Sequence, residues 1–214
     1  MGMAGEGLQA EAPVLVLASA SAARRAVLAG AGLRFEAVAA AVDEGAIKEA
    51  ARAEGIPAAD AALMLAEAKA RRIAARWPEA VVIGCDQILV LPEPDGDDRW
   101  FDKPESVAAA RAHLLALRGR THRLVTAVLC WRGGRRIWQH VAAPALTMRP
   151  FSDAFLDAYL AMEGEALTAT VGAYRLEGPG VQLFDTVEGE HAAVLGLPLL
   201  PLLGFLRQHG VLVR

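Results

Sequence analysis

Hydrophobic and polar positions along the chain predict strands that run directly into helices. Residues 14–17 are four apolar residues that favour β-structure, and residues 18–21 form a small polar turn. An alanine- and arginine-rich helix is expected to follow to about residue 28. Residues 80–91, AVVIGCDQILVL, are the most β-like run of the sequence. A run that is apolar at almost every position is typical of a strand covered on both faces of its sheet.

The rest of the pattern predicts further strands and helices, with turn and cap residues between them. Residues 132–135, RGGR, contain the glycine pair typical of a hairpin turn between two strands. Ser152 is a suitable N-cap for the helix that follows it, and the glycines within residues 168–183 allow a close backbone approach. Additional strands are expected at 33–37, 124–131, 136–141 and 145–148, and helices at 105–117, 153–162 and 197–209.

Residues 45–77 are rich in alanine and predict two helices separated at Pro57, which cannot continue the first helix. Asp60 is expected to cap the second helix. Glu67 and Lys69 fall outside the apolar stripe of this helix, so Lys69 is expected to face a cleft instead of the core. The predicted core-facing stripe consists of Leu63, Ala66, Ala70, Ile73 and Trp77.

Composition narrows the class of protein. The 214 residues are 54% hydrophobic and carry a formal net charge of −3. The chain therefore lacks the excess positive charge that is typical of nucleic-acid-binding proteins. No uninterrupted apolar run is long enough to span a membrane. Cys85 and Cys130 lack a metal-binding spacing, which favours a reducing, cytoplasmic setting. Residues 1–12 lack the features of a secretory signal and are expected to form a flexible tail before a single domain, residues 13–214.

Residues 18–25 combine several features of an anion-binding site. Ser19 and Ser21 offer hydroxyl groups, and Arg24 and Arg25 lie in the first turn of the predicted helix. Free backbone N–H groups at a helix start favour an anion such as phosphate. The same residues are also consistent with an ordinary N-cap on a solvent-exposed helix. The pattern alone leaves both interpretations open.

Asp86 is the most unusual polar residue of the chain, because it lies inside the most apolar predicted strand. A carboxylate in such a strand is costly to bury unless it has a partner, binds a metal or lines a pocket. A functional carboxylate and a buried structural hydrogen bond are both consistent with this position.

Several short motifs, each weak alone, share the order and spacing of one family. They are, in chain order, LASAS followed by Arg24 and Arg25, then Phe35, Glu36, Val42, Asp43, Glu44, Leu65, Ala66, Lys69, Ala70, Ile83, Gly84, Cys85, Asp86, Lys103, Pro104, Gly172, Ala173, Tyr174, Glu177, Gly178 and the closing GLPL. In these motifs the chain resembles the Maf family of nucleoside triphosphate pyrophosphatases, from about residue 14 to the C-terminus. It departs from the family at Ala22, where proline is usual, and at Ala193, where asparagine is often found.

The resemblance implies a fold and an activity. The expected fold is α/β, a mixed central sheet flanked by helices with two lobes around a nucleotide-binding cleft, as in Maf and inosine triphosphatase-like proteins. The expected reaction is hydrolysis of the α–β phosphoanhydride bond of a nucleoside triphosphate with Mg²⁺ or Mn²⁺, which removes modified or non-canonical nucleotides. Members are commonly homodimers, and the apolar hairpin at residues 124–141 is the candidate surface. A nucleotide-binding regulator of cell division that acts through partner proteins without turnover is the alternative, and a purely structural domain is a third interpretation.

By the same resemblance, individual residues receive roles. Asp86 matches the catalytic acidic position, as general base or metal ligand, and Asp43 and Glu44 match a second acidic pair. Oxygen ligands of this kind suit Mg²⁺ or Mn²⁺. Lys69 and Lys103 match cations that contact the phosphate oxygens of the substrate. The expected phosphate-binding loop contributes Ser19, Ser21 and Arg24.

Three positions distinguish subgroups of the family, and here they are Ala23, Gln87 and Glu177. Gln87 and Glu177 match the members that resemble 7-methyl-GTP pyrophosphatases, whereas Ala23 stands where those members have a stacking tryptophan. A carboxylate at position 177 can accept hydrogen bonds from the N1–H and N2–H₂ edge of guanine, and it suits a methylated, positively charged base. A preference for 7-methyl-GTP-like substrates is the resulting hypothesis.

Overall fold

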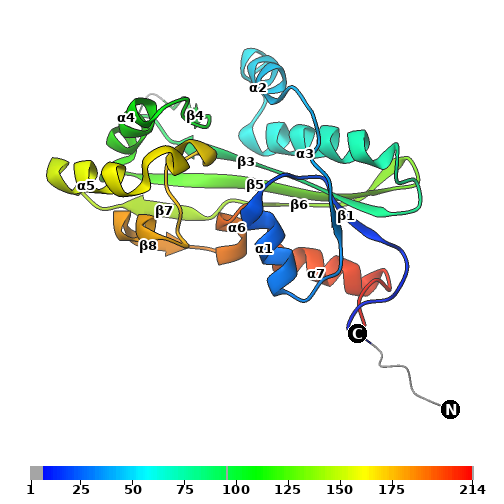
Figure 1. The fold of residues 1–214 in the computed structure, drawn as a ribbon. Helices are drawn as coiled ribbons and strands as arrows, with labels where there is room; N and C mark the ends of the chain where they lie inside the picture. Colours follow the sequence, from blue (N-terminus) through cyan, green and yellow to red (C-terminus); the bar gives the residue numbers. More distant parts are fainter. Residues whose placement is uncertain (1–6, 95, 214) are drawn as a thin grey trace. The chain divides into compact units, whose positions relative to one another are not determined.

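A computed structural model of the chain describes residues 7–94 and 96–213 as strands and helices around a mixed sheet (Figure 1). In chain order the elements are β1 (Leu15–Leu17), α1 (Ala22–Gly30), β2 (Glu36–Ala37), α2 (Glu44–Ala53), α3 (Ala58–Ala74), β3 (Val81–Leu91), β4 (Arg99–Phe101), α4 (Val107–Leu117), β5 (Thr121–Arg132), β6 (Arg135–Ala142), β7 (Ala145–Met148), α5 (Asp153–Glu163), η1 (Gly164–Ala169), η2 (Pro179–Leu183), β8 (Phe184–Glu188), α6 (His191–Val194) and α7 (Leu199–Gln208).

The sheet mixes parallel and antiparallel strands in the order β2-β1-β3-β5-β7-β8, with β4 paired to β3 and β6 paired to β5. β1 runs parallel to β2 and to β3, whereas β4, β6, β7 and β8 each join by antiparallel pairing. The predicted α/β class with a mixed central sheet is therefore confirmed. Among the helices that the structure describes, none is both long and apolar enough to cross a membrane.

Contacts within the chain divide it into two compact units. The described residues of unit 1 are those up to Gln87, Thr126–Ala142 and those from His191 onward, and unit 2 comprises Ile88–Val125 and Ala143–Glu190. β3 and β5 each contribute residues to both units. Part of the predicted flexible tail, residues 1–6, lies outside the described residues.

The other part of that predicted tail pairs with the C-terminal segment. Gln9 forms an antiparallel β-bridge with Leu212, and the Ala10 N–H donates to the Val211 carbonyl at 2.9 Å. The Gln9 side chain also bonds the backbone of Arg34 through both its amide oxygen and its amide nitrogen. Both backbone polar groups of Arg34 are thus bonded to Gln9, and the strand predicted at residues 33–37 is shorter, with Glu36 and Ala37 paired to β1.

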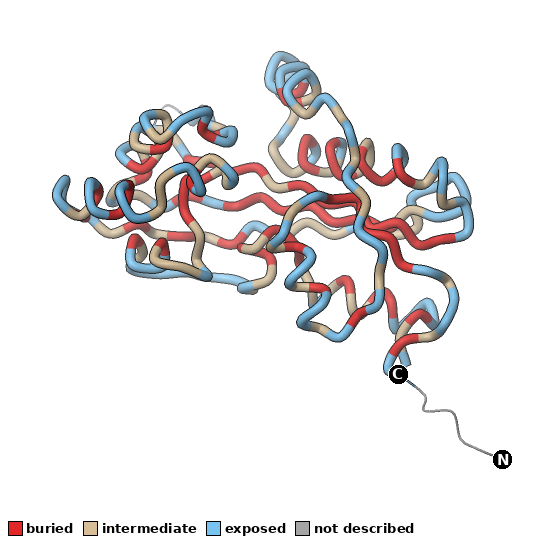
Figure 2. The backbone as a smooth tube through the Cα atoms, in the orientation of Figure 1, coloured by how far each residue is buried: buried red, intermediate tan, exposed pale blue. Residues whose placement is uncertain are grey.

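Unit 1 has helices on both faces of its sheet. β3 is buried along almost its whole length (Figure 2), and on one face Leu28 of α1 and Phe205 of α7 belong to the same core cluster as its residue Cys85. On the other face α3 approaches closely at Gly84, where an added Cβ would lie 2.2 Å from the carbonyl oxygen of Ala66. This glycine lets α3 lie directly against the strand that carries Asp86.

The structure corrects two predictions for α3. Pro57, not Asp60, occupies the N-cap position, because the fixed φ of proline suits the entry to a helix while Asp60 already lies in the first turn. The buried stripe is shifted from the predicted one: Leu63 is half-buried, and Lys69 faces the sheet with only 7% of its surface exposed. The buried residues of the helix are Ala61, Ala62, Leu65, Ala66, Lys69, Ala70 and Ile73.

β5 and β6 form the predicted hairpin, whose turn uses positive φ angles at Gly133 and Gly134. Its apolar side chains pack inside unit 1: Leu129 and Cys130 are fully buried, and the ring of Trp138 stacks on Phe205 with centroids 5.1 Å apart. Residues 126–142 contribute none of the large exposed hydrophobic side chains of the described chain. β6 keeps partly exposed residues, including Ile137 and Trp138, and a homodimer contact through this hairpin stays a prediction.

Unit 2 places a histidine in its core. His122 of β5 is fully buried, its Nε2 lies 2.8 Å from the hydroxyl of Tyr174, and its Nδ1 has no hydrogen-bond partner among the described residues. Burial lowers the pKa of His122 to about 4. The imidazole is therefore neutral in the folded protein at neutral pH.

Acid is expected to destabilise the protein through His122. The unfolded chain takes up a proton near pH 6.5 and the folded one only near pH 4, so stability is lost as pH falls through this window, by about 3 kcal/mol for this group. Urea unfolding between pH 7 and pH 4.5 measures the slope. His122→Gln, which does not titrate there, is expected to flatten it, and an unchanged slope in that variant would contradict the assignment.

Candidate active site

The loop after β1 is held in shape by its own hydroxyl groups. Ser21 is the N-cap of α1, and its Oγ accepts from the backbone N–H of Arg24 at 3.3 Å. The Oγ of Ser19 accepts from the N–H of Ser21 at 3.2 Å and from Nη1 of Arg24 at 3.4 Å. Because α1 has no acidic residue in its first turn, the positive end of the helix is not neutralised there.

Arg24 ties three segments of unit 1 together instead of lying on the surface. It is 9% exposed, its Nε donates to the Gly196 carbonyl at 2.9 Å, and its Nη1 donates to the Cys85 carbonyl at 3.0 Å. Only Nη2 keeps both of its hydrogens unused among the described contacts. Arg25, by contrast, is exposed. The role predicted for Arg24 in binding phosphate stays a prediction, and the structure adds a second role in fixing the loop.

Gly196 makes the Arg24 contact possible. Its φ of +94° is in a region that favours glycine, and an added Cβ would lie 2.9 Å from Nε of Arg24. A side chain at this position would therefore strain the backbone and push the guanidinium away from the carbonyl that it contacts.

Asp86, Lys69 and Glu44 form a charged cluster on the opposite face of β3. Lys69 of α3 donates to Oδ1 of Asp86 in a short hydrogen bond, and its Nζ lies 2.7 Å from Oε1 of Glu44. Asp86 is only 3% exposed. Burial alone would lower the pKa of Lys69, but the two carboxylates outweigh burial and raise that pKa above its ordinary value. The lysine is therefore charged, and the partner required for a buried carboxylate at position 86 is present.

The second oxygen of Asp86 is the distinctive feature of this cluster. Oδ2 is buried and accepts no hydrogen bond from the described residues. An unsatisfied buried carboxylate oxygen is costly, so it indicates a site for a bound group. A water molecule, a cation or a substrate hydrogen would each satisfy it.

Asp43 and Glu44, predicted as a pair, have different positions. Asp43 is exposed and caps α2 by accepting from the Ala46 N–H at 3.0 Å, while Glu44 reaches Lys69. No group of three metal-binding side chains is found in the described ranges. Mg²⁺ is usually held by one or two carboxylates together with waters and substrate phosphates. Asp86 and Glu44 are the two carboxylates that this cluster offers, and their binding of Mg²⁺ or Mn²⁺ stays a prediction.

Gln87 points away from Asp86, because successive side chains of a strand lie on opposite faces. Its Nε2 donates to Oγ1 of Thr126 at 2.8 Å and lies 3.1 Å from the carbonyl oxygens of both Ala193 and Val194. Thr126 is a residue that sequence reasoning missed, and its only signal was a lone hydroxyl in an apolar strand. Ala23, the other specificity position in this unit, is half-buried on α1.

Lys103 and Glu177 belong to unit 2 and are both exposed. Glu177 lies in a turn shaped by Ala173, a non-glycine residue with a φ of +55°, whose carbonyl accepts from the Tyr159 hydroxyl at 3.3 Å. Arg175 in the same turn bonds Oε2 of Glu163 through both Nε and Nη2. Contacts of Lys103 and Glu177 with a nucleotide stay predictions from the resemblance.

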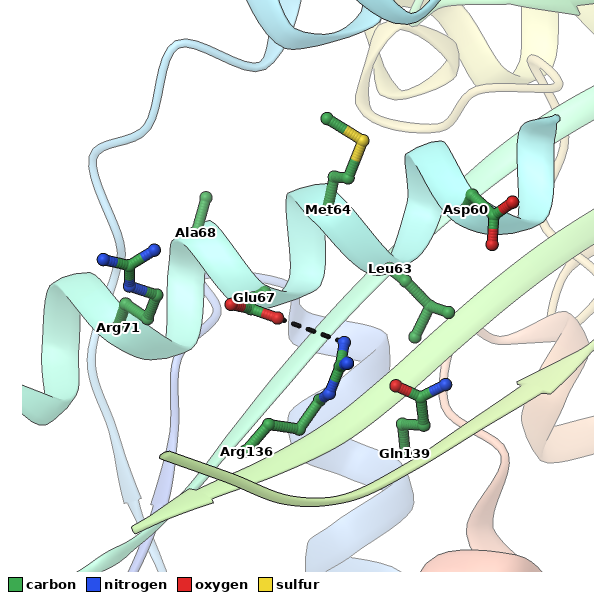
Figure 3. A pocket seen from close by; sticks show the side chains of 8 residues that line it. All are labelled: Asp60, Leu63, Met64, Glu67, Ala68, Arg71, Arg136 and Gln139. Carbon is green, nitrogen blue, oxygen red and sulfur yellow. Dashed lines mark hydrogen bonds and ion pairs between the residues drawn. The ribbon is translucent and has the colours of Figure 1, made fainter. Parts of the chain in front are cut away.

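A surface pocket in unit 1 does not involve any of the candidate site residues. It lies between α3 and β6 (Figure 3), where the exposed Met64 and the half-buried Leu63 line it. Arg136 crosses it to bond Oε2 of Glu67 at 3.1 Å. Glu67 and Lys69, which the sequence placed together outside the core stripe, therefore lie on different sides of α3.

Comparisons with known proteins agree on one family. Residues 14–209 match the family described as Maf-like protein. The chain is 57% identical to a nucleoside triphosphate pyrophosphatase of Granulibacter bethesdensis. The 198 aligned residues cover 92% of this chain and 98% of the relative. It is 53% identical to a protein of the same name from Rhodospirillum rubrum, over 96% of this chain and 100% of the relative. A 7-methyl-GTP pyrophosphatase of Rhizobium meliloti is 47% identical, over 94% and 98%.

Proposed function

The chain belongs to the Maf-like protein family, and we propose that it is a nucleoside triphosphate pyrophosphatase. In this proposal it hydrolyses the α–β phosphoanhydride bond of a nucleoside triphosphate to the monophosphate and pyrophosphate. Its relatives at 53% and 57% identity carry that name over nearly their whole length. The family resemblance indicates the type of reaction. In this proposal, residues of unit 1 provide the general base and most of the groups that bind the triphosphate.

The observation that carries the proposal is the buried cluster of Glu44, Lys69 and Asp86. Lys69 holds Oδ1 of Asp86, which leaves Oδ2 without a donor among the described residues. Oδ2 can take a proton from an attacking water as a new bond forms between the water oxygen and phosphorus. The bond between the α- and β-phosphoryl groups then breaks, and pyrophosphate leaves. Asp86 is the general base in this scheme.

Cations in the same unit would hold the triphosphate. Lys69 and Nη2 of Arg24 offer positive charge, and the start of α1 offers backbone N–H groups. Mg²⁺ or Mn²⁺, held by Glu44 together with phosphate oxygens, would neutralise further negative charge, while Oδ2 of Asp86 acts as the base. In unit 2, Lys103 is the cation assigned to the substrate by resemblance.

We propose a preference for guanine nucleotides, including 7-methyl-GTP, through Glu177. Relatives at 46% to 47% identity are named 7-methyl-GTP pyrophosphatases, and the carboxylate of Glu177 suits the donor edge of guanine. Hydrolysis of such nucleotides would remove modified nucleotides from the cytoplasmic nucleotide pool. The buried free thiols of Cys85 and Cys130 support a reducing setting.

A release assay tests both the reaction and the base preference. Wild-type protein with Mg²⁺ or Mn²⁺ should release pyrophosphate from at least one of GTP, 7-methyl-GTP, UTP and dTTP. Glu177→Gln should lower the ratio of kcat/KM for 7-methyl-GTP over UTP by about 10- to 100-fold, because a hydrogen bond to a charged group is lost. Glu165→Gln, at another exposed glutamate of unit 2, is the matched control and should keep the ratio.

The outcomes separate the claims. An unchanged ratio in Glu177→Gln would reject the base assignment while leaving the reaction intact. Tight nucleotide binding without pyrophosphate release across the panel would reject the reaction and favour a regulator that acts by binding.

A further inference from the structure

A short segment of unit 1, residues 191–197, is held from two directions, and it is called the anchored turn below. Arg24 binds it at the Gly196 carbonyl at 2.9 Å. Gln87 and Thr126 bind it at the carbonyls of Ala193 and Val194. The two attachment points are therefore separated by only two or three residues.

The amide nitrogen of Gln87 is fully engaged by these contacts. This nitrogen, Nε2, has two hydrogens and three acceptors within 3.1 Å, namely Oγ1 of Thr126 and the carbonyl oxygens of Ala193 and Val194. The two carbonyls can only accept, so the nitrogen and not the oxygen of the amide must face them. No hydrogen of this nitrogen is left for a nucleotide base.

Thr126 completes the attachment from the neighbouring strand. Its side chain is fully buried, and its Oγ1 accepts from Gln87 at 2.8 Å while lying 3.1 Å from the Ala193 carbonyl. The same carbonyl also accepts from the backbone N–H of Gly196 at 3.0 Å. Thr126 therefore contacts the very group that closes the turn onto Gly196.

The anchored turn leads directly to the phosphate-binding loop. The Gly196 carbonyl orients the guanidinium of Arg24, whose Nη1 reaches both Oγ of Ser19 and the Cys85 carbonyl. Gly196 adopts a φ of +94°, which glycine reaches without strain, so the turn can present this carbonyl to Arg24. A shift of the turn would therefore move Arg24, and with it the loop.

We propose that Thr126 and Gln87 are positioning residues that set the phosphate-binding loop through the anchored turn and Arg24. In this proposal Gln87 acts through its amide nitrogen on the triphosphate end of every nucleotide. This inference rests on the proposed function, since it assigns these residues a part in the same reaction.

Thr126→Val removes the hydroxyl at nearly constant size and tests the inference. We expect kcat/KM for pyrophosphate release to fall about 10- to 100-fold, because a small misplacement of positioning groups has effects of this size. The fall should be equal for GTP, 7-methyl-GTP, UTP and dTTP. Thr126→Ser, which keeps the hydroxyl, should restore activity to near wild type. Gln87→Met, similar in length but without a donor, should behave as Thr126→Val does.

A measurement that does not depend on turnover accompanies the assay. Hydrogen exchange of the backbone amides of Leu195, Gly196 and Leu197 should be faster in Thr126→Val than in the wild type. Thr147→Val is the matched control, since it removes a strand hydroxyl that pairs with Thr121 at 2.8 Å in unit 2. It should leave both the exchange and the activity unchanged.

Three results would overturn the inference. They are wild-type kcat/KM in Thr126→Val and Gln87→Met, a change confined to the ratio between bases, and failure of Thr126→Ser to restore activity. If the wild type released no pyrophosphate at all, the proposed function would fail. The exchange rates would still show whether Thr126 holds the turn.

Discussion

Asp86→Asn is expected to lower kcat for pyrophosphate release by about 100- to 10,000-fold, the range typical of losing a general base. Asparagine keeps the shape of the side chain, and its amide oxygen can still accept from Lys69. It cannot take a proton from water at the position of Oδ2, which has no donor among the described residues. The loss should therefore appear mainly in kcat and for every nucleotide that the wild type hydrolyses.

Two controls separate this loss from unfolding. Circular dichroism and thermal unfolding should show a folded protein at the assay temperature. Asp157→Asn makes the same change at an exposed carboxylate that pairs with Arg111, and it should keep wild-type activity. Turnover retained by folded Asp86→Asn would remove Asp86 from the chemistry.

Lys69→Met is expected to destabilise the protein by about 3–5 kcal/mol, as breaking a buried ion pair does. The substitution removes the partner of Oδ1, so neither oxygen of the buried Asp86 has a donor among the described residues, and it also removes the contact with Glu44. Because the pKa of Lys69 is raised above 10.5, the lysine's charged contribution is complete below that pH and is lost only as pH rises through the raised pKa. Urea unfolding at pH 8 therefore measures the full effect.

A double-mutant cycle identifies the partner responsible. Lys69→Met combined with Asp86→Asn should lose less stability than the sum of the single changes, because the buried charge is gone in the double variant. Lys103→Met, at an exposed lysine, should change the free energy of unfolding by less than about 0.5 kcal/mol. Additive effects of the two cluster substitutions would contradict a coupled pair.

Local features of the fold were predictable from the sequence because short-range chemistry determines them. The step from β1 through a serine N-cap into α1, the RGGR hairpin and the Ser152 cap are all present. Asp86 was identified as needing a partner because the cost of burying a carboxylate can be judged from sequence alone. The predicted mixed sheet is confirmed as well.

Long-range contacts were not predictable in the same way. The bond from Arg24 to Gly196 joins residues 172 positions apart, and no local pattern indicates that a guanidinium in a first helical turn is buried. Lys69 was expected to face a cleft, yet it lies in the buried stripe because Asp86 and Glu44 supply the charges that it needs. β8 and α6 escaped prediction because their apolar pattern is weak, with four of the five β8 residues exposed.

The central claim is that this chain releases pyrophosphate through Asp86. The most direct test follows the phosphorus-containing products by ³¹P NMR, with GTP, 7-methyl-GTP, UTP or dTTP and Mg²⁺ or Mn²⁺, for the wild type and for folded Asp86→Asn. We predict equal amounts of nucleoside monophosphate and pyrophosphate from the wild type and almost none from the variant. Release of orthophosphate with nucleoside diphosphate, or equal product from both proteins, would contradict the account.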